Sequence, residues 1–237
     1  MKSAKSVDLP WLAWLAHLYT ATGAVLAFLS MRAIVVLEYR EAFLWMYAAT
    51  IVDATDGWLA RRLRVSERLP HFSGTKLDDI VDYLTFVFVP AFLLYRAGTL
   101  PASSGAAVAC GVLLASAYGF SRENAKTADH FFTGFPSYWN ITAFYLYAAG
   151  MSPALNASLV LLLCALVFVP IGYVYPSRTP TLGRTTVALG VVWGLLVLWM
   201  VWELPQVRGW LLAGSLAFPA YYAVLSFILH ARRRSRT

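Results

Sequence analysis

The chain has 237 residues, of which 59% are hydrophobic and only 13% charged, and its mean hydropathy is +0.62. A soluble domain carries about 25% charged residues, so this composition excludes an ordinary soluble protein and predicts an all-α, polytopic integral membrane protein. The net charge of +7 fits contact with anionic lipid headgroups or an anionic substrate, and we expect no nucleic-acid partner.

Apolar runs of the length that crosses a bilayer, roughly 17–25 residues, recur along the chain and leave little room for a separate soluble domain. We therefore treat residues 1–237 as one transmembrane domain. About eight transmembrane helices are predicted, at residues 12–31, 42–61, 77–97, 104–121, 134–151, 155–175, 185–204 and 209–230.

The basic residues lie mainly at one end of this predicted bundle, which orients it by the positive-inside rule. The larger group has fifteen of the 19 Lys and Arg residues: Lys2, Lys5, Arg61, Arg62, Arg64, Arg68, Lys76, Arg122, Lys126, Arg178, Arg184, Arg232, Arg233, Arg234 and Arg236. The other side has Arg32, Arg40, Arg96 and Arg208. We expect the first side, with both chain termini and the polar segments 61–76 and 121–137, to be cytoplasmic.

Five of the twelve acidic residues are crowded into thirty positions: Asp53, Asp56, Asp78, Asp79 and Asp82. Asp53 and Asp56 are three residues apart and Asp78 and Asp82 four apart, so each pair projects from one face of its helix. The second span runs toward the cytoplasm and the third away from it, and at about 1.5 Å per residue the two pairs lie at matching depths. We expect Asp56 to lie near Asp78, and Asp53 near Asp82.

Four carboxylates this close require a cation, because each repulsive contact costs about 4 kcal/mol at 4 Å and an effective dielectric of 20. Oxygen-only ligands suit Mg²⁺ or Mn²⁺, and four carboxylates are enough to hold two ions. The cluster has no Cys or His, which argues against zinc. The carboxylates alone are equally compatible with a proton relay, a sodium site or partners for buried arginines.

Small residues beside Asp56 leave room for a ligand. Gly57 and Ala60 have no bulky side chain on that face of the helix, and Gly74 has none at the start of the third span. Arg61 offers a planar guanidinium to a diphosphate. These residues favour metal-dependent chemistry on a phosphate ester over ion transport.

Eight residues of this region, Asp53, Asp56, Gly57, Ala60, Arg61, Gly74, Asp78 and Asp82, resemble the signature of the CDP-alcohol phosphatidyltransferases at all of its fixed positions. The gap from Arg61 to Gly74 departs from most of the family, because it holds twelve residues instead of about eight or nine. This longer gap resembles the choline-using branch of the family. So do the stretches AHLYTATGAVLAF, ATIVDATDGWLARRLRV, LDDIVDYLTFVFVPAFLLYR and DHFFTGFPSYWNITAFYLY.

The resemblance implies a six-helix catalytic core within residues 1–178 and two additional helices in residues 179–237. It implies transfer of the phosphatidyl group from CDP-diacylglycerol to choline, with release of CMP. It also implies a multi-pass protein of the bacterial cell inner membrane, surrounded by membrane lipids and often homodimeric.

The family's site roles transfer to this chain through the matched positions. Asp82 is implied as the catalytic base, and Gly57, Ala60, Arg61 and Gly74 are implied to line the site for CDP-diacylglycerol. Two divalent ions, with Mn²⁺ favoured over Mg²⁺, are implied on Asp53, Asp56, Asp78 and Asp82. Asp79 lies about 100° around the helix from Asp78, so we expect it to be solvated or to support the ligands.

Substrate recognition outside the signature rests on residues at the same face. Arg122 and Lys126 are candidates to bind the phosphates of CDP-diacylglycerol, although a role in topology explains them nearly as well. The quaternary ammonium of choline is normally held by aromatic faces. Tyr83, Tyr138 and Trp139 are the choline-binding candidates, because they lie near the cytoplasmic mouth.

Two alternatives stay open. The first keeps the chemistry and changes the acceptor to serine, inositol or glycerol phosphate, although a phosphate-bearing acceptor would need further cationic residues beside the site. The second is an ion-coupled transporter, which would need its acidic site near the bilayer midplane. The aspartates lie within about 13 Å of the basic edge, so their depth favours the enzyme.

Overall fold

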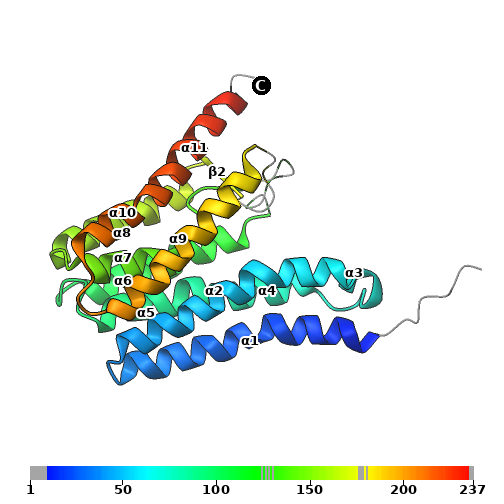
Figure 1. The fold of residues 1–237 in the computed structure, drawn as a ribbon, viewed down its shortest axis with the longest axis horizontal. Helices are drawn as coiled ribbons and strands as arrows, with labels where there is room; N and C mark the ends of the chain where they lie inside the picture. The colour runs from blue at the N-terminus through cyan, green and yellow to red at the C-terminus, as the bar shows by residue number, and fades with distance from the viewer. Residues whose placement is uncertain are drawn as a thin grey trace, which may run out of the picture.

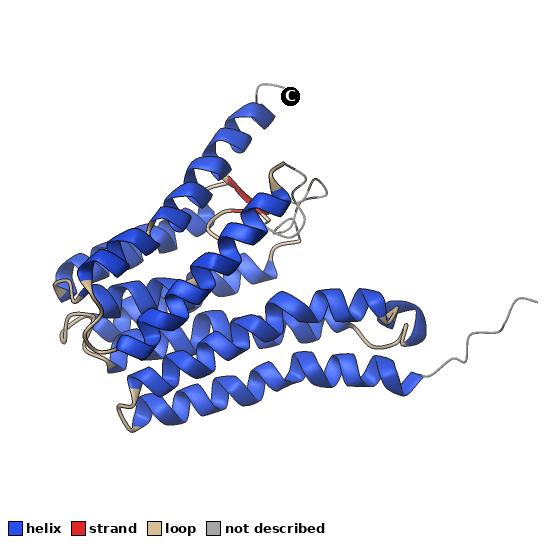
Figure 2. Ribbon diagram, in the orientation of Figure 1, coloured by secondary structure: helices blue, strands red, loops and turns tan. Residues whose placement is uncertain are grey.

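The fold is mainly helical, as predicted, with one short pair of strands (Figures 1 and 2). The computed structural model describes residues 10–123, 125, 127, 129, 131–175, 179 and 181–234. Each of the eight predicted spans corresponds to a helical segment, although several ends differ. The strand pair was not predicted, and it is the main departure from an all-α fold.

The first half of the chain forms a layer of antiparallel helices. α1 (Pro10–Val35) packs along α2 (Tyr39–Arg62), and a short helix α3 (Val65–Arg68) follows in the loop. A long rod then begins at α4 (Gly74–Asp82), where the Ser73 side chain caps the helix by accepting from the Lys76 N–H at 3.2 Å. Figure 1 shows α1, α2 and α4 running together along one edge of the molecule.

The rod continues from α4 through a π-helical stretch, η1 (Tyr83–Phe88), into α5 (Val89–Arg96). Pro90 explains the position of this irregularity, because proline has no N–H to donate to the preceding turn and its ring crowds that turn. Thr85 donates to the Val81 carbonyl at 3.0 Å within the widened segment. The π-helix therefore begins directly after Asp82, and π-helical turns often accompany functional sites.

The second half contains the helices that enclose the other side of the molecule. They are α6 (Gly105–Ser121), α7 (Trp139–Ala149), α8 (Pro153–Phe168), α9 (Gly183–Glu203), α10 (Gly209–Ser215) and α11 (Ala217–Arg234). Two predicted spans were too long at their ends. Ser137 has a left-handed backbone, with φ 56°, so α7 begins only after it, and Pro170 holds Val169 in an extended conformation that ends α8.

An antiparallel ribbon forms from one strand in the predicted polar segment 121–137 and one strand in the part of the predicted span 155–175 that is not helical. Strand β1 (Phe131–Thr133) pairs with β2 (Gly172–Val174) so that Phe131 faces Val174, Phe132 faces Tyr173, and Thr133 faces Gly172. The ribbon lies beside α11, as Figures 1 and 2 show. It therefore joins the loop after α6 to the loop after α8.

The surface of the bundle is apolar, as a lipid-facing surface is. Among the described residues, three helical segments are long and apolar enough to cross a bilayer, Trp11–Val35, Gly183–Glu203 and Gly209–Arg233, and α6 and α8 are apolar but shorter. Leu114 is 73% exposed, whereas the small residues Ala13, Ala16 and Ala33 of α1 are buried. Small residues at helix contacts and large apolar residues outside are typical of membrane bundles.

Candidate active site at the mouth of the bundle

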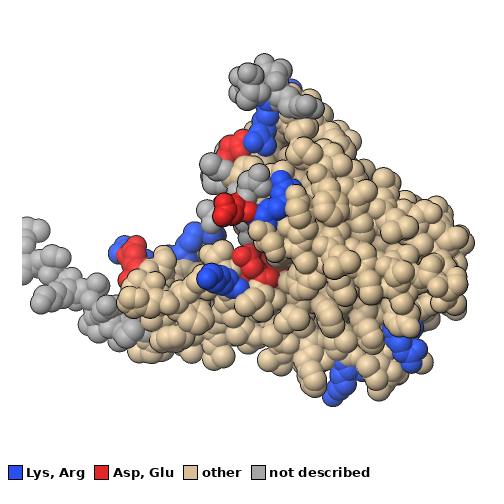
Figure 3. All heavy atoms as spheres, turned by 180° about the vertical axis from the view of Figure 1, so that it is seen from behind, with Lys and Arg blue, Asp and Glu red and all other residues tan. Residues whose placement is uncertain are grey.

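A single large cavity connects most of the residues singled out in the sequence. Its volume is about 1490 Å³, and its lining comes mainly from α1, α2, α3, α4, α6, α7, α9 and the ribbon. The opposite view in Figure 3 shows acidic and basic side chains gathered around a hollow in the apolar surface. Polar groups therefore concentrate where the lining elements end.

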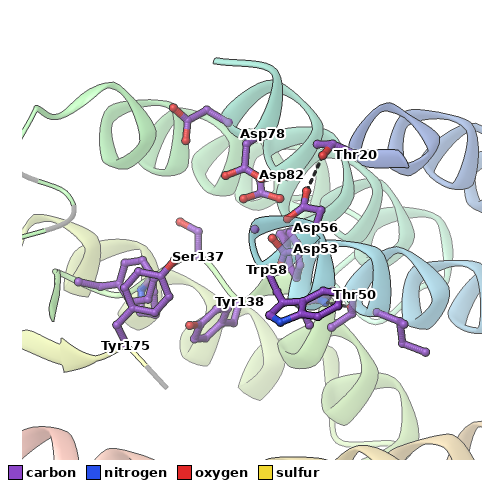
Figure 4. Close-up of a pocket in the computed structure, with 18 of the residues that line it drawn as sticks. Thr20, Thr50, Asp53, Asp56, Trp58, Asp78, Asp82, Ser137, Tyr138 and Tyr175 are labelled. Atoms are coloured by element: carbon purple, nitrogen blue, oxygen red, sulfur yellow. Dashed lines mark hydrogen bonds between the residues drawn. The ribbon is translucent and has the colours of Figure 1, made fainter. Parts of the chain in front are cut away.

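Three of the predicted metal ligands converge on one point of the cavity. Asp53 of α2 and Asp78 and Asp82 of α4 each offer a carboxylate oxygen, and these oxygens lie within 4.8 Å of one another. All three side chains are half-buried and line the cavity. Figure 4 shows Asp78 and Asp82 pointing toward α2, as expected for residues one helical turn apart. This brings Asp53 close to Asp82, as the matching depths indicated.

Asp56 lies beside this group but has a different environment. It is only 7% exposed, and its Oδ2 accepts a hydrogen bond of 2.8 Å from Thr20 Oγ1 of α1 (Figure 4). Sequence reasoning did not identify Thr20, although it lies in the stretch AHLYTATGAVLAF that resembles the family. The contact fixes the Asp56 carboxylate against α1, at the edge of the same cavity.

The donor set fits a hard divalent cation. The converging groups are carboxylate oxygens alone, which is the ligand type preferred by Mg²⁺ and Mn²⁺. Carboxylates at this spacing repel one another unless a cation lies among them. The acidic cluster is thus suited to bind metal.

The two signature glycines make room for larger neighbours. A Cβ on Gly57 would lie 3.1 Å from Arg61 Nη1, so the guanidinium folds back over the bare backbone one turn away. A Cβ on Gly74 would lie 2.9 Å from Cε1 of His17. Gly57, Gly74, Arg61 and Ala60 all line the cavity, so the structure brings this part of the prediction together.

His17 is a cavity residue that sequence reasoning missed. It is 6% exposed, packs against the ring of Phe72 at 4.4 Å between centroids, and lines the cavity beside Gly74. Within the described part of the chain, its Nε2 has no hydrogen-bond partner. The only signal in the sequence was a histidine in an apolar helix, which is more often a core residue.

Arg122 and Lys126 were predicted to bind the phosphates of CDP-diacylglycerol, and the structure describes only the first of them. Arg122 is half-buried, lines the cavity and lies over the ring of Tyr118, 5.6 Å from its centroid. Lys126 lies outside the described residues. Arg122 therefore lies in the cavity lining at the end of α6.

Only one of the three choline-binding candidates lies in the cavity wall. Tyr138 belongs to the lining. Tyr83 turns toward α6, where its hydroxyl donates to the Leu113 carbonyl at 2.9 Å, and it is absent from the lining.

Trp139 is also absent from the lining: it is fully buried, and its Nε1 donates to Ser116 Oγ at 2.7 Å. Two aromatic residues that sequence reasoning missed, Phe132 of β1 and Tyr175 after β2, line the cavity instead. Figure 4 shows Tyr138 and Tyr175 across the open space from the aspartates.

The comparison with known proteins assigns the chain to a family. Residues 13–221 match the model of the CDP-alcohol phosphatidyltransferases, so the chain belongs to that family, whose members are membrane enzymes. The matched residues include all four aspartates and the cavity around them.

Curated relatives cover nearly the whole chain. A phosphatidylcholine synthase of Legionella pneumophila is 39% identical over 223 residues, which are 91% of this chain and 87% of the relative. One from Pseudomonas aeruginosa is 37% identical over 210 residues, 87% of this chain and 88% of the relative. One from Rhizobium meliloti is 33% identical over 213 residues, 90% of this chain and 88% of the relative.

Proposed function

We propose that the chain is a phosphatidylcholine synthase, which transfers the phosphatidyl group of CDP-diacylglycerol to choline and releases CMP. The observation that carries this proposal is the convergence of Asp53, Asp78 and Asp82 in a cavity that also contains Gly57 and Arg61. The relatives that carry this name cover about nine-tenths of the chain, which supports choline as the acceptor.

CDP-diacylglycerol is assigned to the part of the cavity between α2 and α4. The bare backbone at Gly57, Ala60 and Gly74 lets the flat nucleotide approach the helices closely. Arg61 and Arg122 supply positive charge for the phosphates. Lys126 remains a further candidate for the same role.

Asp82 acts as the base in the proposed reaction. In the proposed mechanism a carboxylate oxygen of Asp82 accepts the hydroxyl proton of choline while the choline oxygen bonds to the lipid-linked phosphorus. The bond from that phosphorus to the oxygen of the CMP phosphate breaks, and the electron pair leaves with CMP. Arg61 holds the diphosphate in place, so that the attacking oxygen and the leaving group are oriented for displacement.

Asp53, Asp56, Asp78 and Asp82 would hold two divalent ions, Mn²⁺ or Mg²⁺. Such ions offset the charge of the diphosphate and stabilise CMP as it leaves. Thr20 supports this set by fixing Asp56, in the way that residues behind metal ligands usually orient them. Asp79 has the supporting or solvated role expected from its place on the helix.

Choline is assigned to the aromatic side of the cavity. Its trimethylammonium group has no hydrogen-bond donor and is attracted to ring faces. Tyr138, Tyr175 and Phe132 line the cavity, and the first two face the aspartates in Figure 4. We therefore assign the ammonium to these three rings, in place of Tyr83 and Trp139.

The membrane topology completes the proposal. Cytoplasmic termini agree with the asymmetry of basic residues between the two ends, and eight crossings of the bacterial inner membrane are what the apolar runs and the family resemblance imply. α7 has only 11 residues, about 16 Å of helix, so the fifth crossing needs the residues before it as well. The family resemblance also implies a homodimer.

The test is an acceptor panel. Purified protein in detergent or vesicles receives CDP-diacylglycerol and Mn²⁺ with labelled choline, serine, inositol or glycerol phosphate in parallel. We expect labelled phosphatidylcholine and an equal amount of CMP from choline alone. A preference for another acceptor would overturn the choline assignment. If no acceptor leads to release of CMP, the proposed enzymatic activity is wrong and an ion-coupled transporter is the alternative.

A further inference from the structure

The last helix of the chain holds the edge of the ribbon. Within β2, the Val174 N–H donates to Ser226 Oγ and the Gly172 N–H donates to His230 Nδ1, each at 3.1 Å. Tyr222 of α11 donates its hydroxyl to the Val174 carbonyl at 2.9 Å. An exposed strand edge leaves such groups unpaired. Side chains of α11 therefore occupy the place that a third strand would take.

The spacing of these contacts explains how a helix binds a strand edge. Tyr222, Ser226 and His230 are four residues apart, so they form one stripe along α11, with steps of about 6 Å. Successive outward N–H groups of a strand are two residues apart, or about 6.8 Å. The two repeats match closely enough for Ser226 to meet Val174 and His230 to meet Gly172.

The contact is close and includes further groups. Gly172 allows the approach, because a Cβ there would lie 2.8 Å from Arg233 Nη1. Arg233 forms a salt bridge with Asp129, Nε to Oδ2 2.8 Å, and its guanidinium lies 4.5 Å from the ring centroid of Phe131. Phe131 and Val174 are buried with Leu225 and Leu229 of α11. These contacts attach both strands of the ribbon to the helix.

The ribbon in turn borders the aromatic wall of the cavity, which we define as Phe132 of β1, Tyr138 at the start of α7 and Tyr175 after β2. Phe132 and Tyr175 have ring centroids 4.6 Å apart, and Phe132 meets Tyr138 at 6.5 Å. Tyr222 also contacts the wall directly, with its ring 6.2 Å from that of Tyr138 in an edge-to-face arrangement. A single residue of α11 thus contacts both the edge of β2 and the wall.

We propose that α11 is a positioning element for acceptor recognition, in which Tyr222 and Ser226 hold the ribbon so that the aromatic wall receives a quaternary ammonium. This inference rests on the proposed function, because the ammonium is that of choline. It gives a role in substrate binding to a helix that lies outside the six-helix core implied by the family resemblance. Tyr222 and Ser226 act through the wall, and the reacting atoms stay with the aspartates.

The test compares two tyrosines that are adjacent on α11. Tyr222→Phe removes the hydroxyl that binds Val174, and Tyr221→Phe removes one that pairs with Thr186 of α9 at 2.9 Å. We expect Tyr222→Phe to raise the KM for choline about fivefold, the usual effect of one lost hydrogen bond, with the KM for CDP-diacylglycerol unchanged. Tyr221→Phe should leave both KM values as in the wild type.

Ser226 supplies a second, smaller variant. Ser226→Ala should raise the KM for choline in the same way, and Ser226→Thr should restore it because the hydroxyl is kept. Inhibition by 3,3-dimethylbutanol, the uncharged analogue of choline, should change less than the KM for choline, since the ring faces attract the positive charge.

Unchanged choline KM values in both Tyr222→Phe and Ser226→Ala would overturn the inference. An equal rise in the KM for choline with Tyr221→Phe would also overturn it, because that result assigns α11 only a structural role. A wild-type protein that makes no phosphatidylcholine would instead overturn the proposed function itself.

Discussion

Thr20 on α1 donates a hydrogen bond of 2.8 Å to the buried carboxylate of Asp56 on α2. The bond connects two helices at the edge of the acidic cluster. Loss of a residue that orients a metal ligand typically costs about 10- to 100-fold in metal affinity or activity. We therefore expect Thr20→Val to raise the Mn²⁺ concentration needed for half-maximal activity at least tenfold, measured in a metal titration.

Thr22 provides the matched control for this experiment. Its hydroxyl donates to the Tyr19 carbonyl within α1 at 2.6 Å and is absent from the cavity lining. Thr22→Val should leave the metal titration as in the wild type. Equal titrations for Thr20→Val and the wild type would contradict the role of Thr20.

Removal of one negative charge from the acidic cluster should abolish activity and raise the stability of the metal-free protein. Asp53→Asn and Asp82→Asn keep the side-chain shape, so we expect turnover to be lost while the protein folds. In EDTA each variant should melt at a higher temperature than the wild type, because one repulsive charge is gone.

Addition of Mn²⁺ to the same samples gives the second half of this test. It should raise the melting temperature of the wild type and have a much smaller effect on the variants. Asp79→Asn is the comparison, and it should keep activity within about threefold of the wild type. A variant at position 53 or 82 that stays active and is still stabilised by Mn²⁺ would count against the metal assignment.

Gly74 should be sensitive to a single added methyl group. A Cβ at this position would lie 2.9 Å from His17 Cε1, so Gly74→Ala forces the imidazole, which lines the cavity, to shift. We expect a higher KM for CDP-diacylglycerol, by about tenfold, with the KM for choline little changed; tenfold corresponds to about 1.4 kcal/mol.

Gly111→Ala is the control for Gly74, since a Cβ there meets no atom within 4 Å among the described residues. Replacing a helical glycine by alanine usually stabilises a helix by about 1 kcal/mol, so this variant should be at least as stable as the wild type. Should Gly74→Ala bind CDP-diacylglycerol as tightly as Gly111→Ala, the close approach at Gly74 has no part in nucleotide binding.

The aromatic wall gives a prediction for Tyr138 itself. Tyr138→Phe keeps the ring face, so the KM for choline should stay within about threefold of the wild type. Tyr138→Ala removes it, and the KM should rise roughly tenfold or more. Steady-state kinetics with choline as the varied substrate checks both. An equal rise in the KM for choline in both variants would show that the hydroxyl matters rather than the ring face, and an unchanged KM in Tyr138→Ala would exclude Tyr138 from choline binding.

The helical part of the site was predictable because its geometry is local. Asp78 and Asp82, one turn apart, must share a face of α4, and the short loop from α2 brings Asp53 opposite them. The tertiary partner of Asp56 was not predictable in this way. Thr20 lies 36 residues earlier, and nothing in its own helix marks it as a hydrogen-bond donor to Asp56.

The acceptor side of the site was harder to predict for a physical reason. Phe132 and Tyr175 are in contact only because β1 pairs with β2, and the paired residues are 39 to 43 positions apart in the sequence. Strands of three residues have no periodicity that the sequence could reveal. Tyr83 and Trp139 were chosen by proximity along the chain. Their polar atoms instead bind Leu113 and Ser116 of α6, away from the cavity lining.

The central claim is that the choline hydroxyl attacks the lipid-linked phosphorus of CDP-diacylglycerol. It is tested most directly with choline carrying ¹⁸O in its hydroxyl group and with mass spectrometry of both products. The account predicts ¹⁸O in phosphatidylcholine and unlabelled CMP. Label recovered in a cytidylyl-choline product together with free phosphatidate would contradict it, because attack would then have occurred at the other phosphorus.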